Sequence, residues 1–332
     1  MTERPSTLRW GIVGTGGIAN RMAPMLQQAT LADTAAVSSR RMSSAKEFAA
    51  AHGVPATFDD WGRMLASDAI DAVYVATPTS VREEISIAAA RNGKHVLAEK
   101  PFASAESVRR IASACREHDV AFMDGTHFVH HPRTATIRDY ALNRLGRPIV
   151  LDTTFQFRLD DPTNIRLRPD LEPMGAIGDA GWYNMRAITE FLPPDIALRD
   201  VTVYARRHPE TGAVSSAVGM LRFDHDAVSS FNCGFESGAL TMDLRLTGPD
   251  GAVYADDFVL PPPGESHFRY RKGGLGSTEQ LSEAAPQPAA AAMFDDFAHA
   301  AADDSLREQW MLASERTQHL LDAVWQAATR DA

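Results

Sequence analysis

The chain has 332 residues, of which 44% are hydrophobic and 23% charged, as in ordinary globular proteins. The formal net charge of −10 argues against a nucleic-acid partner, because such proteins gather Lys and Arg on one surface. Residues 1–5 have no apolar core of the signal-peptide type, and no stretch approaches the ~18 apolar residues of a membrane span. We therefore expect a cytoplasmic protein with no membrane partner. The two cysteines, Cys115 and Cys233, exclude a disulfide framework.

Residues 8–124 alternate short β-rich runs with longer segments whose apolar residues recur at helical spacing. The helical segments are 43–52, 79–92 and 104–118, and the β-rich runs are Leu8–Val13, Thr34–Ser38, Ala72–Ala76, His95–Ala98 and Val120–Met123. This alternation predicts an α/β domain with a doubly wound parallel sheet of the Rossmann type, which we place at residues 1–124.

A glycine-rich motif follows the first run and opens a helix. It consists of Gly14, Thr15, Gly16, Gly17, Ile18 and Ala19. Gly14 permits a tight turn, Gly16 lets a diphosphate approach the backbone, and Ala19 stands where the helix meets the strand. Free N–H groups at the helix start favour negative charge. Because the motif lies at the first strand of a repeated βα pattern, it predicts a dinucleotide site.

The end of the second run indicates which dinucleotide is bound. Ser39, Arg40 and Arg41 stand where NAD sites place a carboxylate for the ribose 2′-hydroxyl. A guanidinium beside a hydroxyl residue suits a 2′-phosphate instead. The sequence therefore favours NADP. NAD stays possible, because the two arginines could also be simple solvated side chains.

Two further motifs identify a family. Residues 71–79 read DAVYVATPT and residues 93–101 read GKHVLAEKP, and both resemble the glucose–fructose oxidoreductase, inositol dehydrogenase and rhizopine-catabolism (Gfo/Idh/MocA) family. The resemblance implies that Thr77 and Pro78 line the cofactor and that Glu99 and Lys100 lie near the nicotinamide, with Lys100 at the reacting centre. It also implies a cis peptide bond before Pro101.

The chain departs from this family at one point. Many relatives follow the A-T-P turn with Asn and His, whereas this chain has Thr79 and Arg82. Independently of the resemblance, Lys100 is one of only four lysines and follows a predicted parallel strand, at the sheet edge where such folds bind ligands. A surface lysine on a loop is the alternative reading.

The alternation of β-rich runs and helical segments ends after residue 124. We assign 125–332 to a second, α+β domain with a large, mostly antiparallel, open-faced sheet. Helices are predicted at 134–145 and 178–191, strands at 149–159 and near 199–207, 214–223, 227–236 and 240–247, a loop at 261–287, and two helices within 289–329. The resemblance implies that this domain binds substrate and that the outer face of its sheet pairs subunits, which gives a homodimer or a higher homo-oligomer.

The second domain carries the motif GAIGDAGWY at residues 175–183. It is similar to the family pattern in which an Asp and a His or Tyr stand four residues apart, here Asp179 and Tyr183, on one helix face. Tyr is typical of the glucose–fructose oxidoreductase, dihydrodiol dehydrogenase and sugar-ketoreductase branches. Two alternatives stay open. Tyr183 could be a half-buried core residue, and Asp179 could be an ordinary carboxylate at a helix N-terminus. The stretch around Arg166 resembles an uncharacterised plant-type branch, and we assign Arg166 to the substrate pocket.

Three histidines follow the first domain closely. His127, His130 and His131 could line the substrate pocket, serve the structure, or bind a metal. The family places an aromatic or His-containing segment beside the active site, so we assign His127 and His131 to the pocket. No carboxylate or cysteine lies close in sequence and hydride transfer needs no metal, so we expect no metal.

The combined expectation is an NADP(H)-dependent oxidoreductase that moves a hydride between the nicotinamide and a carbonyl or alcohol of a sugar, ketosugar, polyol or dihydrodiol. Tyr183 is the expected proton donor or acceptor, Lys100 would favour its phenolate and polarise the carbonyl, and Asp179 would orient them. Lys100 as the acid stays open. One alternative is a non-catalytic dinucleotide-binding regulatory protein. Another, a glycosidase with tightly held NAD, would need the missing acidic residue after the second run.

Overall fold

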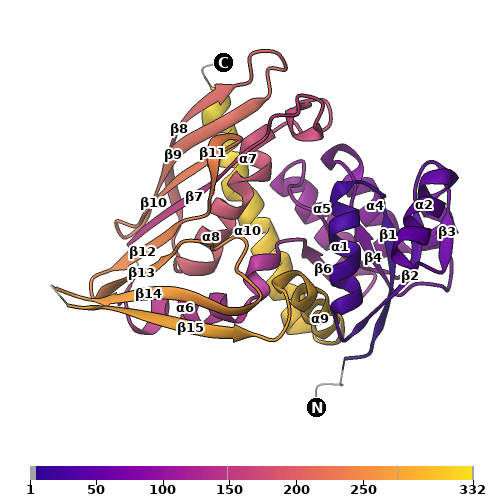
Figure 1. Ribbon diagram of the computed structural model, residues 1–332, viewed down its shortest axis with the longest axis horizontal. Coiled ribbons are helices and arrows are strands. Elements are labelled where there is room, and N and C mark those ends of the chain that lie inside the picture. The colour runs from indigo at the N-terminus through magenta and orange to yellow at the C-terminus, as the bar shows by residue number, and fades with distance from the viewer. Residues whose placement is uncertain (1–4, 148, 275, 331–332) are drawn as a thin grey trace. The chain divides into compact units, whose positions relative to one another are not determined.

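The computed structural model describes residues 5–147, 149–274 and 276–330, and within them the chain forms two compact units (Figure 1). The first unit contains the described residues up to His127 together with Gln287–Glu315. The second contains Phe128–Pro286 and the described residues from Arg316 onward. The first break lies close to the expected boundary at 124/125, but the expected second domain included 287–315, which fold with the first unit. Residues 1–4, where no signal-peptide core is expected, lie outside the described residues.

The first unit is built on a six-stranded parallel sheet in the order β3-β2-β1-β4-β5-β6. The strands are β1 (Leu8–Val13), β2 (Ala32–Ser38), β3 (Ala56–Phe58), β4 (Ala72–Val75), β5 (His95–Ala98) and β6 (Phe122–Asp124). Five helices connect them: α1 (Gly17–Gln28), α2 (Met42–His52), α3 (Trp61–Leu65), α4 (Thr79–Arg91) and α5 (Ala105–Glu117). This strand order is that of the doubly wound dinucleotide-binding fold, so the expected fold class is confirmed.

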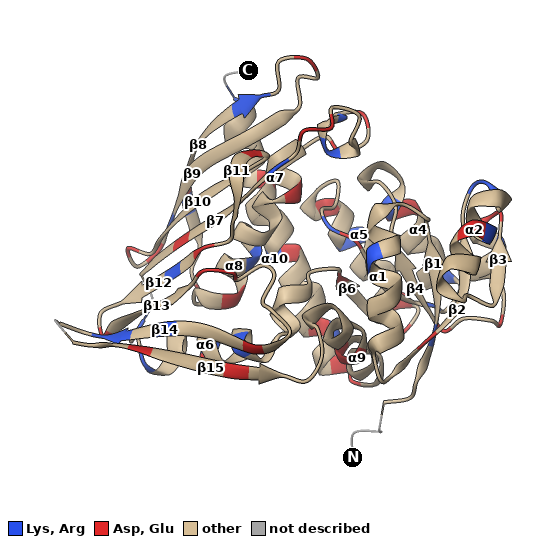
Figure 2. Ribbon diagram, in the orientation of Figure 1, with Lys and Arg blue, Asp and Glu red and all other residues tan. Residues whose placement is uncertain are grey.

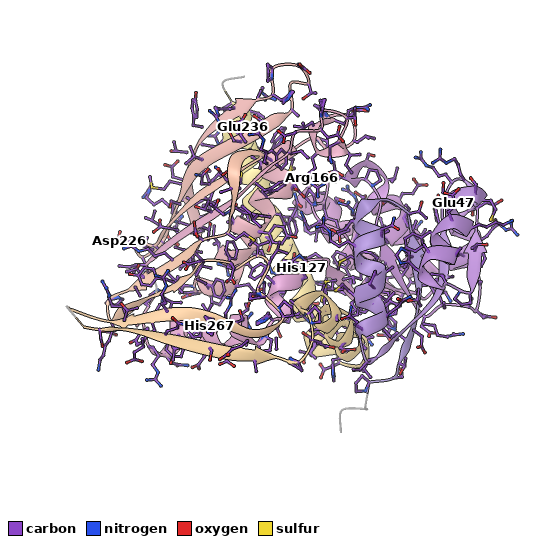
Figure 3. The ribbon with its side chains drawn as sticks, in the orientation of Figure 1. Glu47, His127, Arg166, Asp226, Glu236 and His267 are labelled. Carbon is purple, nitrogen blue, oxygen red and sulfur yellow. The ribbon has the colours of Figure 1, made fainter. Side chains whose placement is uncertain are left out.

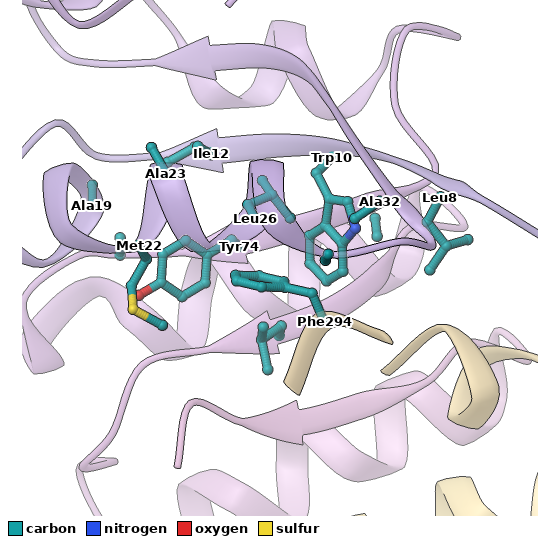
Figure 4. Packing of buried hydrophobic residues seen from close by; sticks show 14 of the residues in the cluster. Leu8, Trp10, Ile12, Ala19, Met22, Ala23, Leu26, Ala32, Tyr74 and Phe294 are labelled. Carbon is teal, nitrogen blue, oxygen red and sulfur yellow. The ribbon is translucent and has the colours of Figure 1, made fainter. Parts of the chain in front are cut away.

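One core of the first unit is completed by a helix from far along the chain, α9 (Ala289–Ala302). The Trp10 ring of β1 lies 5.1 Å from the Phe294 ring, centroid to centroid (Figure 4). It also lies 5.0 Å from the Phe297 ring. The Asp295 carboxylate accepts hydrogen bonds from the backbone N–H groups of Thr30 (2.8 Å) and Leu31 (2.7 Å), before β2. Residues 287–315 are therefore part of the dinucleotide-binding fold and not an appendage of it.

The second unit is a nine-stranded, mostly antiparallel sheet. Its order is β15-β14-β13-β12-β7-β10-β9-β8, with β11 paired to β7 and a parallel pair at β10–β7. The strands are β7 (Val150–Arg158), β8 (Leu198–Arg207), β9 (Val214–Phe223), β10 (Val228–Gly234), β11 (Glu236–Thr241), β12 (Leu244–Gly248), β13 (Gly251–Ala255), β14 (Gly264–Lys272) and β15 (Thr278–Ala285). Helices α6 (Pro132–Asn143), α7 (Gly175–Asp179) and α8 (Gly181–Phe191) pack against it (Figure 1), while α10 (Asp304–Thr329) runs through both units. The expected α+β architecture is confirmed.

Two expectations for this unit are wrong. Residues 261–287, expected as a loop, contain the β14–β15 hairpin, in which Ser266, Phe268 and Tyr270 are buried and their neighbours exposed. The prolines before β14 and the glycines between β14 and β15 mask this period of two. The helix expected at 178–191 consists of α7 and α8, separated at Ala180, and Asp179 ends the first of them rather than lying at the start of one long helix.

The many arginines are largely used in ion pairs. On α5, Arg110 pairs with Glu83 (2.6 Å) and Arg116 with Glu308 (2.8 Å). In Figure 2 basic and acidic residues are interspersed over both units. Among the described residues, no helix combines the length and the apolar character that crossing a membrane requires.

Candidate active site

The glycine-rich turn after β1 has the geometry that the sequence predicts. Gly14 has a φ of +106°, and a Cβ there would lie 2.5 Å from the carbonyl oxygen of Ala76, the residue that follows β4. Both the backbone angle and the close approach therefore require glycine. The turn after β1 and the A-T-P turn after β4 are thus in contact at the carboxyl edge of the sheet.

Helix α1 begins at this turn with its N-terminus open. Gly16 is the N-cap and provides no side-chain cap, and a Cβ placed on Gly16 or Gly17 would meet no other atom within 4 Å. The Asn20 amide donates to the carbonyl oxygens of Thr15 (3.1 Å) and Gly16 (3.0 Å), which holds the turn. An uncapped helix N-terminus with glycine on its approach fits the diphosphate of a dinucleotide.

Ser39, Arg40 and Arg41 follow β2 beside this turn. The Thr15 hydroxyl lies 3.4 Å from that of Ser39. Arg41 donates to Ser44 (3.2 Å), whereas Arg40 is exposed and forms no hydrogen bond or ion pair with any residue that the structure describes. A guanidinium that has no hydrogen-bond or ion-pair partner among the described residues suits a phosphate on the ribose.

The E-K-P turn follows β5. The Lys100–Pro101 peptide bond is cis, as expected. Glu99 is buried and accepts a hydrogen bond from the Tyr74 hydroxyl (2.5 Å), and burial raises the pKa of its carboxyl. Lys100 is half-buried. Of the other lysines, Lys94 is used structurally, since its Nζ donates to the carbonyl oxygens of residues 67 and 70.

A buried hydroxyl also supports a cofactor on this edge. Thr77, in the A-T-P turn, has its Oγ1 buried with no hydrogen-bond partner within the described part of the chain. Buried polar atoms normally have partners, so such an atom is suited to a bound ligand. Together with Gly16 and Arg40, it shows that the residues present fit a phosphorylated dinucleotide.

In the second unit the structure brings Arg166 and Asp179 together. The Arg166 Nε donates to the Asp179 carboxylate at 2.7 Å, and this arginine is labelled in Figure 3. Arg166 is the middle residue of the 3₁₀ turn Ile165–Leu167, and the Asn164 side chain before the turn accepts a hydrogen bond from the Arg166 N–H (3.1 Å). The negative charge of Asp179, and to a lesser extent that of ionised Tyr183, raises the pKa of Arg166. Arg166, Asp179 and Tyr183 thus form one electrostatic group.

Tyr183 lies on the first turn of α8 and is 7% exposed. Its ring meets the Phe155 ring edge-on (5.3 Å between centroids) and lies 6.3 Å from the Phe128 ring. The helix break at Ala180 keeps helical backbone angles, so Asp179 and Tyr183 stay close. Gly175 fixes the preceding turn, since a Cβ there would lie 2.4 Å from the Val214 carbonyl oxygen.

The three histidines at 127, 130 and 131 have different surroundings. His127, labelled in Figure 3, is half-buried on the 3₁₀ turn His127–His130, and His130 is buried. His131 is 1% exposed and caps α6, with its Nδ1 accepting the Arg133 N–H (3.1 Å). Its position favours the structural alternative over the assignment to the substrate pocket. Where residues are described, no group of three or more His, Cys, Asp or Glu could hold a metal ion.

Comparison with known proteins agrees with this geometry. A family model described as an oxidoreductase family with an NAD-binding Rossmann fold matches residues 8–126, and a GFO/IDH/MocA C-terminal domain model matches residues 140–254. The chain belongs to the Gfo/Idh/MocA family of oxidoreductases. It is 30% identical over 275 residues to D-xylose 1-dehydrogenase (NADP(+)) 2 of Haloferax volcanii, covering 82% of this chain and 83% of that protein.

Two further known proteins match over nearly the full length. The dTDP-3,4-didehydro-2,6-dideoxy-alpha-D-glucose 3-reductase of Streptomyces violaceoruber is 29% identical, covering 98% of this chain and 97% of that protein. The structure of a 3-ketoreductase from Actinomadura kijaniata, in complex with NADP and TDP-benzene, superposes with a TM-score of 0.86 at 26% identity, covering 98% of each chain. The family assignment made from the A-T-P and E-K-P motifs is confirmed.

Sequence reasoning missed two residues beside these motifs. Tyr74, the hydrogen-bond partner of Glu99, was read only as part of an apolar strand. Arg82 was noted as a departure from the family, with no function attached. Of the predicted catalytic residues, Lys100 belongs to the first unit, and Asp179 and Tyr183 belong to the second.

Proposed function

We propose that the protein is an NADP(H)-dependent oxidoreductase that acts on a carbonyl or alcohol group of a sugar, ketosugar, polyol or dihydrodiol. One observation carries the proposal. On the carboxyl edge of a single parallel sheet lie the uncapped N-terminus of α1, the exposed Arg40, and Lys100. The similarity to a D-xylose dehydrogenase and to a reductase of a dTDP-linked didehydro-dideoxyglucose supports the substrate class.

A bound nicotinamide dinucleotide supplies or accepts the hydride. The N–H groups at the start of α1 bind the diphosphate, and the helix dipole adds to this attraction. Ser39 and Arg40 hold the 2′-phosphate, with Arg41 beside them. Because NAD lacks that phosphate, this arrangement favours NADP over NAD.

Lys100 and Tyr183 act on the oxygen of the reacting group. During reduction the carbonyl carbon takes the hydride and its oxygen takes the Tyr183 proton, while the Lys100 ammonium stabilises the developing negative charge. During oxidation the phenolate accepts the alcohol proton. The phenolate also gains from Arg166, whose cation lies within electrostatic reach of Tyr183 in the same unit. Asp179 holds Arg166 in place and is therefore a positioning residue rather than the base.

The proposal is tested with purified protein, first by NADPH and NADH binding measured from nucleotide fluorescence. Turnover is then assayed with NADP⁺ and a panel of aldoses, polyols and dihydrodiols, and with NADPH and ketosugars. We expect turnover with at least one class. Lys100→Met should abolish turnover while NADPH affinity stays within about threefold, since the lysine acts on the reacting group. Lys46→Met, at an exposed position of α2, is the matched control.

Two results would contradict the proposal. Retention of more than about a tenth of the unmodified kcat by Lys100→Met would remove the lysine from the reacting centre. Tight NADPH binding without turnover on any class would instead indicate the non-catalytic regulatory protein.

We also propose that the protein forms a homodimer or larger homo-oligomer through the outer face of the second sheet. Tyr204, Val218 and Met220 are 70%, 49% and 52% exposed, and Tyr204 and Val218 are directly paired on β8 and β9. Neighbouring apolar side chains exposed on a sheet are typical of an interface. Light scattering after gel filtration should give at least twice the 36.2 kDa mass of one chain, and Met220→Arg should lower it.

A further inference from the structure

Helix α4 carries a buried arginine on its first turn, directly after the A-T-P turn. Arg82 is 3% exposed, although arginine is among the residues least often buried. Burying a guanidinium is costly unless hydrogen-bond acceptors and a compensating charge lie around it. The contacts of Arg82 therefore indicate the function of this buried arginine.

The guanidinium joins two turns that are far apart in the sequence. Its Nη2 donates to the carbonyl oxygen of Thr77, in the A-T-P turn. Its Nη1 donates to the carbonyl oxygen of Pro101, in the E-K-P turn, and to the Thr79 hydroxyl (3.1 Å). That hydroxyl also donates to the Pro101 carbonyl oxygen (3.4 Å). A single side chain thus bridges the backbone after β4 and the backbone after β5.

The fork of donors explains why arginine is required for this bridge. Arginine has five N–H donors in a rigid plane, whereas histidine has at most two and lysine presents a point charge. Neither of these side chains can reach both carbonyl oxygens and the hydroxyl in one plane. The His that many relatives have at this position therefore cannot make the same set of contacts.

The charge of Arg82 has a partner as well. The Glu99 carboxyl is buried, which raises its pKa, and the charge of Lys100, the Tyr74 hydrogen bond and the charge of Arg82 all oppose that rise. Arg82 therefore favours the ionised form of Glu99, the residue before Lys100. Carbonyl contacts and charge both connect α4 to the E-K-P turn.

We propose that Arg82 is a positioning residue whose guanidinium locks the A-T-P and E-K-P turns together and so fixes the backbone that carries Lys100. The inference rests on the proposed function for the role of Lys100. It predicts a specific defect: without the bridge, the dinucleotide still binds at α1 and Arg40, but the lysine is misplaced during the reaction.

The test compares Arg82→Lys, which keeps the charge without the fork, with Thr79→Val, which keeps the shape and removes one hydroxyl. Arg91→Met, exposed at the end of the same helix, is the control. We measure NADPH affinity, kcat, melting temperature and hydrogen exchange. Because displacement of a reacting group by about 1 Å can cost about a hundredfold, Arg82→Lys should lower kcat by about 10–100-fold. NADPH affinity should stay within about threefold, since α1 and Arg40 are untouched.

Hydrogen exchange provides a readout that needs no substrate. Arg82→Lys should speed exchange in peptides covering 77–82 and 99–104 and leave β1, β2 and α1 unchanged. Thr79→Val should do the same more weakly and still fold, since it removes one hydroxyl and leaves the hydrogen bonds of Arg82 to the Thr77 and Pro101 carbonyl oxygens in place. If Arg82→Lys does not fold, Thr79→Val alone carries both readouts.

Three outcomes overturn the inference. Unchanged kcat with unchanged exchange would show that the bridge has no effect. A parallel loss of NADPH affinity and kcat, with faster exchange throughout residues 8–126, would make Arg82 an ordinary core residue. Faster exchange at the two turns with unchanged kcat would show a bridge that does not position Lys100. Absence of turnover in the unmodified protein would refute the proposed function, and the exchange comparison would still decide whether Arg82 joins the turns.

Discussion

His95, the first residue of β5, should make the first unit sensitive to acid. Its Nδ1 accepts a hydrogen bond from the Ala121 N–H (2.9 Å), and its ring lies 6.4 Å from the Phe297 ring. Burial, with a smaller contribution from Arg307, lowers the pKa of the imidazole from 6.5 to about 4, against the opposite influence of Asp71 and Asp119. The folded protein therefore holds a neutral His95, because a proton on Nδ1 would break the bond to Ala121.

The sign and size of the effect follow by linkage. Between these two pKa values the unfolded chain binds a proton on His95 that the folded protein does not bind. The contribution of neutral His95 to the free energy of unfolding is therefore complete above pH 6.5 and is lost as the pH falls toward 4. One pKa unit corresponds to about 1.4 kcal/mol, so the whole displacement corresponds to about 3 kcal/mol. Between about pH 7.5 and about pH 5, His95 should remove about 2 kcal/mol from the free energy of unfolding.

The assay is urea unfolding, followed by tryptophan fluorescence at both pH values. In His95→Asn, the amide oxygen can accept the Ala121 N–H and does not titrate. On acidification, the free energy of unfolding of this variant should fall by about 2 kcal/mol less than that of the unmodified protein, whatever its value at neutral pH. His118→Asn, at an exposed helix end, should behave like the unmodified protein. Parallel losses in His95→Asn and the unmodified protein would refute the argument.

Three further predictions concern the site and the second sheet. Tyr183→Phe should lower the rate of the chemical step by about 10²–10⁴ with little change in melting temperature, because only the hydroxyl is removed; near-normal turnover in a stopped-flow assay would assign the proton to Lys100 or water. Arg40→Ala should raise the KM for NADPH about 10–100-fold and leave that for NADH unchanged, and equal changes would make Arg40 a bystander. His225 and Asp226 form a hairpin turn with φ of +56° and +61°, so replacing them by Asn-Gly should add about 1 kcal/mol of stability, visible as a higher melting temperature, which an unchanged or lower one would contradict.

The sequence predicts the first unit well because its strands are short, buried and continuous in apolar character. Leu8–Val13 and His95–Ala98 were expected with the bounds that the structure has. The three-residue β3 and the five-residue α3 were missed, since segments that short carry too little periodicity. The cis bond before Pro101 came from the family resemblance rather than from local propensity.

The parts that were missed depend on contacts distant in sequence. The function of Arg82 appears only when the strand order places the E-K-P turn beside α4, and the sequence by itself shows a replaced family residue. The pairing of Arg166 with Asp179 likewise requires the 3₁₀ turn at Ile165–Leu167 to face α7. The β14–β15 hairpin was hidden because flanking Pro and Gly outweighed a clear alternation of buried and exposed residues.

The return of residues 287–315 to the first unit constrains the order of events during synthesis. Trp10 and Tyr74 leave the ribosome early, but Phe294, whose ring lies 5.1 Å from Trp10 and 5.9 Å from Tyr74, is translated more than two hundred residues later. Until then the nascent sheet exposes one apolar face, and such surfaces attract chaperones or aggregate. A fragment ending at residue 124 should therefore be poorly soluble, and adding a separate peptide of residues 287–315 should restore NADPH binding.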